Sequence, residues 1–203
     1  APRDAGQGVA ARDAVLARIR DPRTRSQIRD ELARERSERG WGSVVIGSTA
    51  HPDHAGFRGQ PLDAVARRMN REPAEAALTL MDKDALGTGA FFFGMSETNL
   101  WRILAEPWVM IGSDASLRAP WGVLSRDYPH PRAYGAFSRF LRAALDGRTV
   151  PVPEAIRKMS GLPAAQFRLA DRGVIRPGAA ADLLVLEPAR LRDRADYGNP
   201  HAL

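Results

Sequence analysis

The chain has 203 residues, of which 44% are hydrophobic and 27% are charged, fractions that are ordinary for a globular protein and exclude a disordered or fibrous one. The formal net charge is +6, yet only Lys83 and Lys158 are lysines, and the arginines are scattered along the sequence. No motif that reads nucleic acid accompanies this charge, so we expect no nucleic-acid partner.

No apolar run reaches the roughly 20 residues that a membrane-spanning helix needs, and residues 1–6 lack the apolar core of a signal peptide. The chain has no cysteine, which suits a reducing compartment. We therefore expect a soluble, cytoplasmic protein without membrane contact, although a leader removed before Ala1 would leave no trace.

From Val9 to Gly40 the sequence predicts two charged surface helices. Their apolar stripes at helical spacing are Val15, Leu16 and Ile19 in the first helix and Ile28 and Leu32 in the second. The pair Asp21-Pro22 divides the two helices, because proline is tolerated in the first turn of a helix but not in its interior.

Three short apolar runs with glycine at their ends predict buried strands: Ser43–Gly47, Ala90–Gly94 and Trp108–Gly112. Between them we expect a loop at 51–56 and helices that begin at Pro61, run from Pro73 to about Leu86, and run from Ser96 to before Pro107. Connections of this length allow parallel crossovers, so the order predicts a parallel sheet that is covered on both faces.

The C-terminal half begins with a predicted loop from Ala115 to Pro131. Helices are expected at about 134–145 and 152–158, with one or two further turns at 162–167. Two short strands, 173–175 and 182–186, are expected around a turn at Pro177-Gly178.

The most informative stretch for chemistry is Val109 to Asp114, where an apolar run ends in Ser113 and Asp114. Barrel enzymes present catalytic groups at the C-terminal ends of their strands. A carboxylate there can act as a general base and then as a general acid, taking up a proton and later giving it back. The alternative is an aspartate that caps the following loop or helix.

Three segments occur in an order that resembles the N-acyl-D-amino-acid deacylases of the metal-dependent amidohydrolase superfamily: 109–114, 128–132 and 171–188. The resemblance is to the C-terminal part of that family, strongest from Phe91 to Asn199 and weak before Trp41. It implies an α/β fold, with residues 1–170 as the C-terminal portion of a TIM-type (β/α) barrel. Residues 171–203 would return to the accompanying small β-sandwich domain.

The same resemblance implies a bacterial, zinc-dependent hydrolase that cleaves the amide bond of N-acyl-D-amino acids. Asp114 would carry the proton, and Arg132 would hold the free carboxylate of the substrate with its planar fork. His130 and Ser113 would contact the substrate or shape the same loop. The bland alternatives are a surface ion pair for Arg132, a rigid loop residue for His130, and packing or capping for Ser113.

One departure from the family leaves the side-chain specificity open. The interval from Ser116 to Asp127 is longer and less rich in histidine than in the best-known members. Separately, a different hydrolase of the superfamily, dihydroorotase-like or dipeptidase-like, is an alternative reading of the whole chain.

The metal is expected to be bound mainly outside this chain. The chain has no cysteine and no His-x-His pair, and its four histidines are dispersed. His51 and His54 have a spacing that could chelate, but no third ligand lies near them, so we expect ordinary loop histidines. Asp114 would be at most a peripheral ligand.

Three strands cannot close a barrel, and unpaired strand edges seek a partner. We therefore expect the N-terminal part of the same enzyme, or a companion chain, to complete the barrel and supply the zinc ligands. By itself the chain would be inactive. An alternative from another class is a catalytically inactive interaction module.

Overall fold

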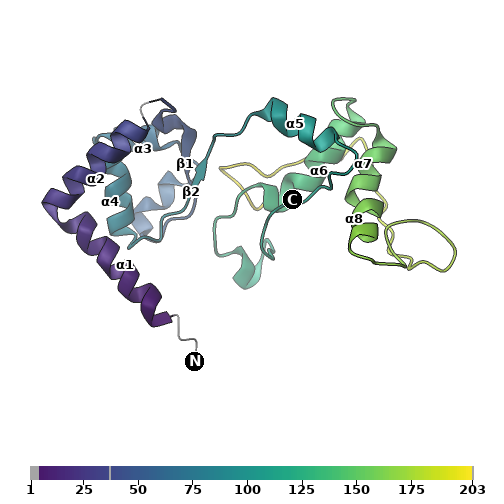
Figure 1. The fold of residues 1–203 in the computed structure, drawn as a ribbon, viewed down its shortest axis with the longest axis horizontal. Helices are drawn as coiled ribbons and strands as arrows, with labels where there is room; N and C mark the ends of the chain where they lie inside the picture. The colour runs from purple at the N-terminus through teal and green to yellow at the C-terminus, as the bar shows by residue number, and fades with distance from the viewer. Residues whose placement is uncertain (1–4, 37, 203) are drawn as a thin grey trace. The chain divides into compact units, whose positions relative to one another are not determined.

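The computed structural model describes residues 5–36 and 38–202, and it divides the chain after Gly94 into two compact units (Figure 1). The first unit contains α1 (Ala5–Arg20), α2 (Pro22–Glu35), η1 (Trp41–Ser43), β1 (Val44–Ile46), η2 (Pro52–Phe57), α3 (Leu62–Arg68), α4 (Pro73–Lys83) and β2 (Ala90–Phe92). The second contains α5 (Glu97–Ala105), η3 (Gly122–Ser125), α6 (Arg132–Leu145), α7 (Val152–Met159) and α8 (Gly161–Gln166). The predicted division into 1–170 and 171–203 concerns the domains of a whole enzyme and stays a prediction.

The two N-terminal helices are confirmed, with the break at the predicted pair. The side chain of Asp21 accepts a hydrogen bond from the Thr24 N–H at 2.8 Å, and Pro22 takes the first position of α2. The surface location is confirmed for α2, which has no buried residue, but Leu16 and Ile19 of α1 are buried. A surface helix still packs one apolar stripe against its neighbours.

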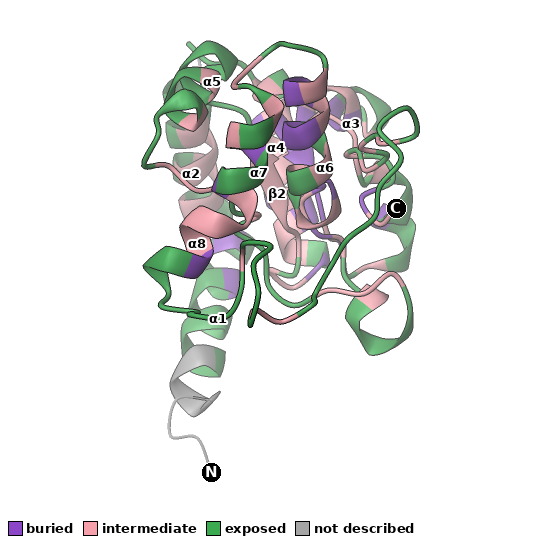
Figure 2. Cartoon of the chain, turned by 90° about the vertical axis from the view of Figure 1, so that its right-hand side faces the viewer, coloured by how far each residue is buried: buried purple, intermediate pink, exposed green. Residues whose placement is uncertain are grey.

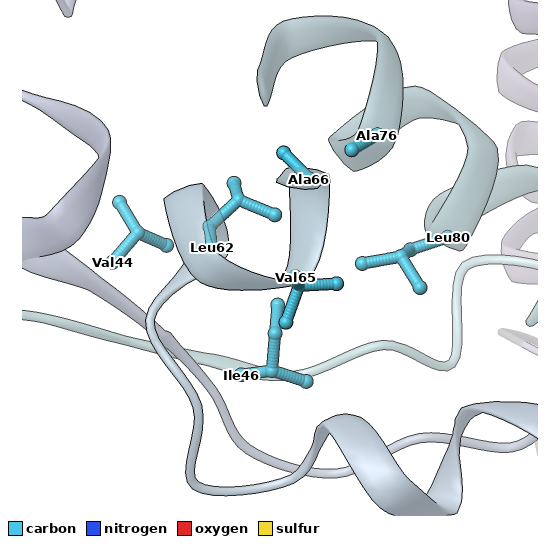
Figure 3. Close-up of a cluster of buried hydrophobic side chains, with 7 residues drawn as sticks. All are labelled: Val44, Ile46, Leu62, Val65, Ala66, Ala76 and Leu80. Atoms are coloured by element: carbon cyan, nitrogen blue, oxygen red, sulfur yellow. The ribbon is translucent and has the colours of Figure 1, made fainter. Parts of the chain in front are cut away.

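The core of the first unit lies between β1 and the helices α3 and α4. Figure 3 shows its buried side chains: Val44, Ile46, Leu62, Val65, Ala66, Ala76 and Leu80. All three residues of β1 are buried, and each helix contributes residues three or four apart, which lie on one face. Burying one large aliphatic side chain of this kind contributes about 1.5–3 kcal/mol.

The predicted parallel sheet is wrong. β1 and β2 pair in the antiparallel sense, with Val44 opposite Phe92 and Ile46 opposite Ala90. Just after β1 the Gly47 N–H donates to the Gly89 carbonyl at 2.8 Å, so the pairing of the two segments continues one residue beyond the strands. An apolar run predicts that a segment is a strand, but it does not set the direction of its partner.

The predicted loop at 51–56 is also wrong, because Pro52–Phe57 forms the short 3-10 helix η2. Nδ1 of His51 accepts a hydrogen bond from the Asp53 N–H at 3.3 Å, and Pro52 follows as the first helical residue. The fixed φ of proline suits a first helical turn as well as a loop.

The predicted third strand, Trp108–Gly112, is not a strand. Its polar backbone groups bind Lys158 instead of a neighbouring strand. The Lys158 ammonium donates to the Val109 carbonyl at 2.9 Å and to the Glu106 carbonyl, and the Ile111 N–H donates to the Lys158 carbonyl at 3.3 Å. The run is therefore held as an irregular segment against α7.

The strands expected at 173–175 and 182–186 are absent from the described second unit as well. Leu184 is 86% exposed and Val185 is 95% exposed. An apolar run becomes a strand only where another strand supplies its ladder of hydrogen bonds. Within residues 95–202 no such partner strand is present.

The helices of the second unit are confirmed to within a few residues. Ser96 caps α5 by accepting the Asn99 N–H at 3.3 Å, and the helix ends before Pro107 as predicted. The core is formed by Phe140, Leu141, Ala144 and Ala155. Figure 2 colours the buried residues of α6 purple. No described helix is long and apolar enough to cross a bilayer, and the compartment stays a prediction.

Candidate active site

Asp114 lies in the irregular segment that follows Ile111 rather than at the end of a strand. Its backbone has a φ of 46°, in the left-handed region that aspartate tolerates better than most residues. The Asp114 side chain is 90% exposed, and its carboxylate accepts a hydrogen bond from Nη2 of Arg132 at 2.7 Å. The same Nη2 also donates to the backbone oxygen of Asp114 at 3.0 Å.

Arg132 is the first residue of α6, and its backbone is held by His130. The Arg132 N–H, one of the first helical N–H groups that lack an intrahelical acceptor, donates to Nδ1 of His130 at 3.0 Å. The intervening residues 115–131 thus return Arg132 to Asp114. The structure brings together three of the four predicted site residues.

His130 is anchored on its other side by Tyr197, which lies 67 residues further along the chain. The Tyr197 hydroxyl is 3.0 Å from Nε2 of His130, and the Tyr128 hydroxyl donates to the Tyr197 carbonyl. Because Nδ1 accepts the Arg132 N–H, a neutral ring carries its proton on Nε2, where it donates to Tyr197. Burial, and then the positive charge of Arg132, lower the pKa of His130 and favour this neutral form.

Two cavities meet at His130 and Arg132. The first, of about 140 Å³, is lined by Asp114, Ala115, Ser116, Arg118, Pro129, His130, Arg132 and Ala133. The second, of about 220 Å³, is lined by His130, Pro131, Arg132, Gly135, Ala136, Arg139, Asp193, Ala195, Asp196 and Tyr197. The predicted residue Ser113 is half-buried beside Asp114 and does not line either of these cavities.

Two residues of these cavities, Arg118 and Tyr197, were not predicted from the sequence. Neither stands in a motif with Asp114 or Arg132, and their place in the site depends on contacts across many residues. The only available signal for Arg118 is its position in the unusual interval from Ser116 to Asp127.

The first cavity combines one carboxylate, two guanidinium groups and an imidazole. A carboxylate and an imidazole can move protons, and guanidinium groups bind carboxylates. The set of residues therefore suits proton transfer beside a bound anion.

A zinc cage does not fit the described residues. Zinc needs three or four protein ligands, and no group of three His, Cys, Asp or Glu side chains is placed to hold a metal within 5–36 and 38–202. The only carboxylate lining the first cavity is Asp114, which is paired with Arg132.

His51 and His54 belong to the first unit, where the His51 side chain is 37% exposed and His54 is buried. Nδ1 of His54 lies 2.6 Å from Oδ1 of Asp84, and the Thr88 hydroxyl donates to Oδ2 of Asp84 at 2.6 Å. His54 and Asp84 are both buried, so the expectation of two ordinary loop histidines is wrong for His54. Burial raises the pKa of Asp84, but the hydrogen bonds from Thr88, the His51 N–H and His54 outweigh it, and the pKa is lowered.

Comparisons with known proteins identify the family. The Amidohydrolase family matches residues 10–200 of the chain. An N-acyl-D-aspartate deacylase from Alcaligenes xylosoxydans xylosoxydans is 35% identical over 148 residues, which cover 70% of this chain and 28% of that protein. A D-aminoacylase from the same organism is 38% identical over 143 residues, with 70% and 27% covered.

Solved structures agree with these relatives. The N-acyl-D-glutamate deacylase from Bordetella bronchiseptica, complexed with zinc and a phosphonate that mimics the tetrahedral intermediate, matches with a TM-score of 0.64 and 34% identity. The match covers 81% of this chain and 32% of that one, so the chain spans less than a third of the relatives' length. The likeness supports the fold of a TIM-barrel amidohydrolase and confirms the resemblance seen in the sequence. The chain belongs to the amidohydrolase family.

Proposed function

We propose that this chain contributes the proton-handling and carboxylate-binding part of the active site of an N-acyl-D-amino-acid deacylase. The reaction is hydrolysis of the amide bond to a carboxylate and a free D-amino acid. The observation that carries the proposal is the pairing of Asp114 with Arg132 at one cavity in a member of this family. Related proteins named as D-amino-acid deacylases support the choice of substrate class.

Asp114 is the proton carrier in this proposal. Its exposed carboxylate takes a proton from the attacking water and passes it to the nitrogen of the departing amine, so one group acts first as base and then as acid. Its place beside Arg132 supports this role, because the substrate carboxylate bound there is one carbon away from the amide nitrogen.

Arg132 binds the α-carboxylate of the substrate. The guanidinium fork suits a carboxylate, and in the structure it already holds one, that of Asp114. An incoming substrate carboxylate replaces that contact and leaves Asp114 available to the water. His130 positions Arg132 by accepting the backbone N–H of Arg132, whereas Ser113, which lines neither cavity, packs beside Asp114.

The division of the chain follows the family: residues 1–170 form part of the barrel, and residues 171–203 return to the small β domain. The exposed apolar run at 182–186 supports a further partner for this segment, because exposed apolar patches mark interaction surfaces. The N-terminal part of the same enzyme, or a companion chain, completes the barrel.

Zinc is bound by a solved relative, and the described residues do not form a cage for it. In our proposal the ligands come from the upstream part of the barrel, and the chain alone is inactive. Zinc, when bound, supplies the activation of water that amidohydrolysis requires. The residues of this chain bind and orient the substrate, and they move the proton.

A fusion enzyme tests the proposal: this chain placed behind the upstream part of the Alcaligenes D-aminoacylase. We expect hydrolysis of N-acetyl-D-amino acids and much slower hydrolysis of the L forms. A folded, zinc-loaded fusion that does not hydrolyse any N-acyl-D-amino acid would refute the proposal. Turnover of dihydroorotate or a dipeptide instead would assign the chain to another branch, and no turnover at all to an interaction module.

A further inference from the structure

A second arginine lines the proposed substrate cavity. Arg118 and Arg132 both line the cavity of about 140 Å³, and the proposed function uses only Arg132. The Arg118 side chain is 25% exposed, and its Nη1 pairs with the carboxylate of Asp127. The pair joins two residues of the interval from Ser116 to Asp127, so it fixes the guanidinium beside the cavity.

Arg118 keeps an unused donor. Its Nε is buried and has no hydrogen-bond partner among the residues that the structure describes. A guanidinium has five N–H donors, and the pair with Asp127 involves Nη1. Because Nε is covered by the surrounding residues, a ligand in the cavity meets the Nη end of the guanidinium, where Nη2 makes no hydrogen bond to the residues that the structure describes.

The remaining lining favours a charged group over a bulky apolar one. The apolar residues around this cavity are Ala115, Pro129 and Ala133, all of them small. A large apolar side chain of a substrate would therefore bury little surface here. Two guanidinium groups in one cavity suit a ligand with two carboxylates.

We infer that Arg118 binds the side-chain carboxylate of the substrate, so that the site prefers N-acyl-D-amino acids with an acidic side chain. Arg132 holds the α-carboxylate and Arg118 the second one. This inference rests on the proposed function, and it assigns a role to the interval by which this chain departs from its family. The substrate class is the N-acyl derivative of D-aspartate or D-glutamate.

The test compares N-acetyl-D-glutamate with N-acetyl-D-alanine in the fusion to the D-aminoacylase upstream part, whose own name does not specify an acidic substrate. We expect kcat/KM to favour the diacid, and Arg118→Leu to reduce that preference by about tenfold to a hundredfold, the range for hydrogen bonds to a charged group. Arg118→Lys should retain part of the preference. Arg126→Leu, an exposed arginine of the same segment that lines neither cavity, is the matched control and should leave it unchanged.

Binding to the 203-residue chain gives a second measurement that does not need turnover. NMR titration with the same two ligands should show tighter binding of the diacid, and Arg118→Leu should remove the difference. Equal kcat/KM and equal dissociation constants for the two ligands would overturn the inference while leaving the proposed function intact. Failure to bind or hydrolyse either ligand would instead refute the proposed function, and the inference with it.

Discussion

Nη2 of Arg132 donates to both the carboxylate and the backbone oxygen of Asp114, at 2.7 and 3.0 Å. The sequence suggested separate roles for these two residues, but in the structure they contact each other directly. Residues that share a contact have mutational effects that do not add, so each variant should also be measured in the background of the other.

Asp114→Asn should abolish most of the turnover of the zinc-loaded fusion. The amide keeps the size of the side chain and a partner for Arg132, but it cannot accept a proton, so we expect kcat to fall by about 10²–10⁴-fold with zinc content unchanged. Asp171→Asn removes another exposed carboxylate of the second unit and is the control. Turnover of Asp114→Asn within a few fold of the parent would remove Asp114 from the reaction.

Arg132→Ala should act mainly on substrate binding. Loss of the guanidinium should raise KM at least about tenfold for substrates with a free α-carboxylate, because a charge-assisted contact is lost. Substrates whose α-carboxylate is converted to an amide should be much less affected. Arg148→Ala, an exposed arginine of the same unit that lines neither cavity and pairs with Asp146 at 2.9 Å, should behave like the parent. An unchanged KM for the free acid would exclude the anchoring role.

The second unit should lose stability in mild acid because of His130. Burial and the charge of Arg132 lower its pKa below the ordinary 6.5, so the unfolded chain binds the proton more tightly than the folded one. The contribution of neutral His130 is complete above pH 6.5 and decreases as the pH falls through 6.5 toward the lower folded value. Urea unfolding at about pH 8 and about pH 5.5 should show the decrease.

The variant His130→Asn isolates this effect. An asparagine oxygen can still accept the Arg132 N–H, but it does not titrate, so the stability of the second unit should depend less on pH than in the parent. His51→Asn, in the first unit, should leave the pH dependence of the second unit as it is. Because the pKa of Asp84 is lowered from 3.8, its effect on stability falls below that pH and outside the range between about pH 5.5 and about pH 8. Equal pH dependence of His130→Asn and the parent would contradict the assignment.

Lys158→Met should destabilise the second unit. The ammonium is fully buried and donates to the carbonyls of Glu106 and Val109, and methionine keeps an apolar stem without the donor. Lost charge-assisted hydrogen bonds, partly offset by removal of a buried charge, should lower the free energy of unfolding by about 1–2 kcal/mol. The exposed Lys83→Met is the control, and hydrogen exchange over residues 95–202 is the measurement. Equal exchange in both variants would contradict the role of Lys158.

The helix boundaries that depend only on neighbouring residues were predicted well from the sequence. Asp21-Pro22 and Ser96 set helix starts by local hydrogen bonds and a fixed φ, and Pro107 follows the end of α5 as expected. These signals act within a few residues, so they do not depend on the rest of the fold.

The pairing of the strands could not be predicted from the sequence. The apolar runs at 108–112 and 182–186 have the composition of strands, but whether they pair depends on segments far away in the chain. The Val109 carbonyl takes its hydrogen bond from Lys158, 49 residues later, which no local pattern indicates. For the same reason the direction of β2 against β1 was not predictable.

The candidate site divides in the same way. Asp114, His130 and Arg132 were found because each stands in a short motif, and the structure brings them together. Tyr197 was missed because its contact with His130 spans 67 residues. Arg118 was missed because one arginine among many has no local mark, and its relevance depends on which cavity it lines.

The left-handed backbone at Asp114 limits which acids can serve there. At a φ of 46°, aspartate and asparagine are tolerated, whereas longer side chains that cannot bond to their own backbone are disfavoured. A glutamate would add reach and conformational cost at once. The backbone conformation at this position therefore favours aspartate over glutamate as the carboxylic acid.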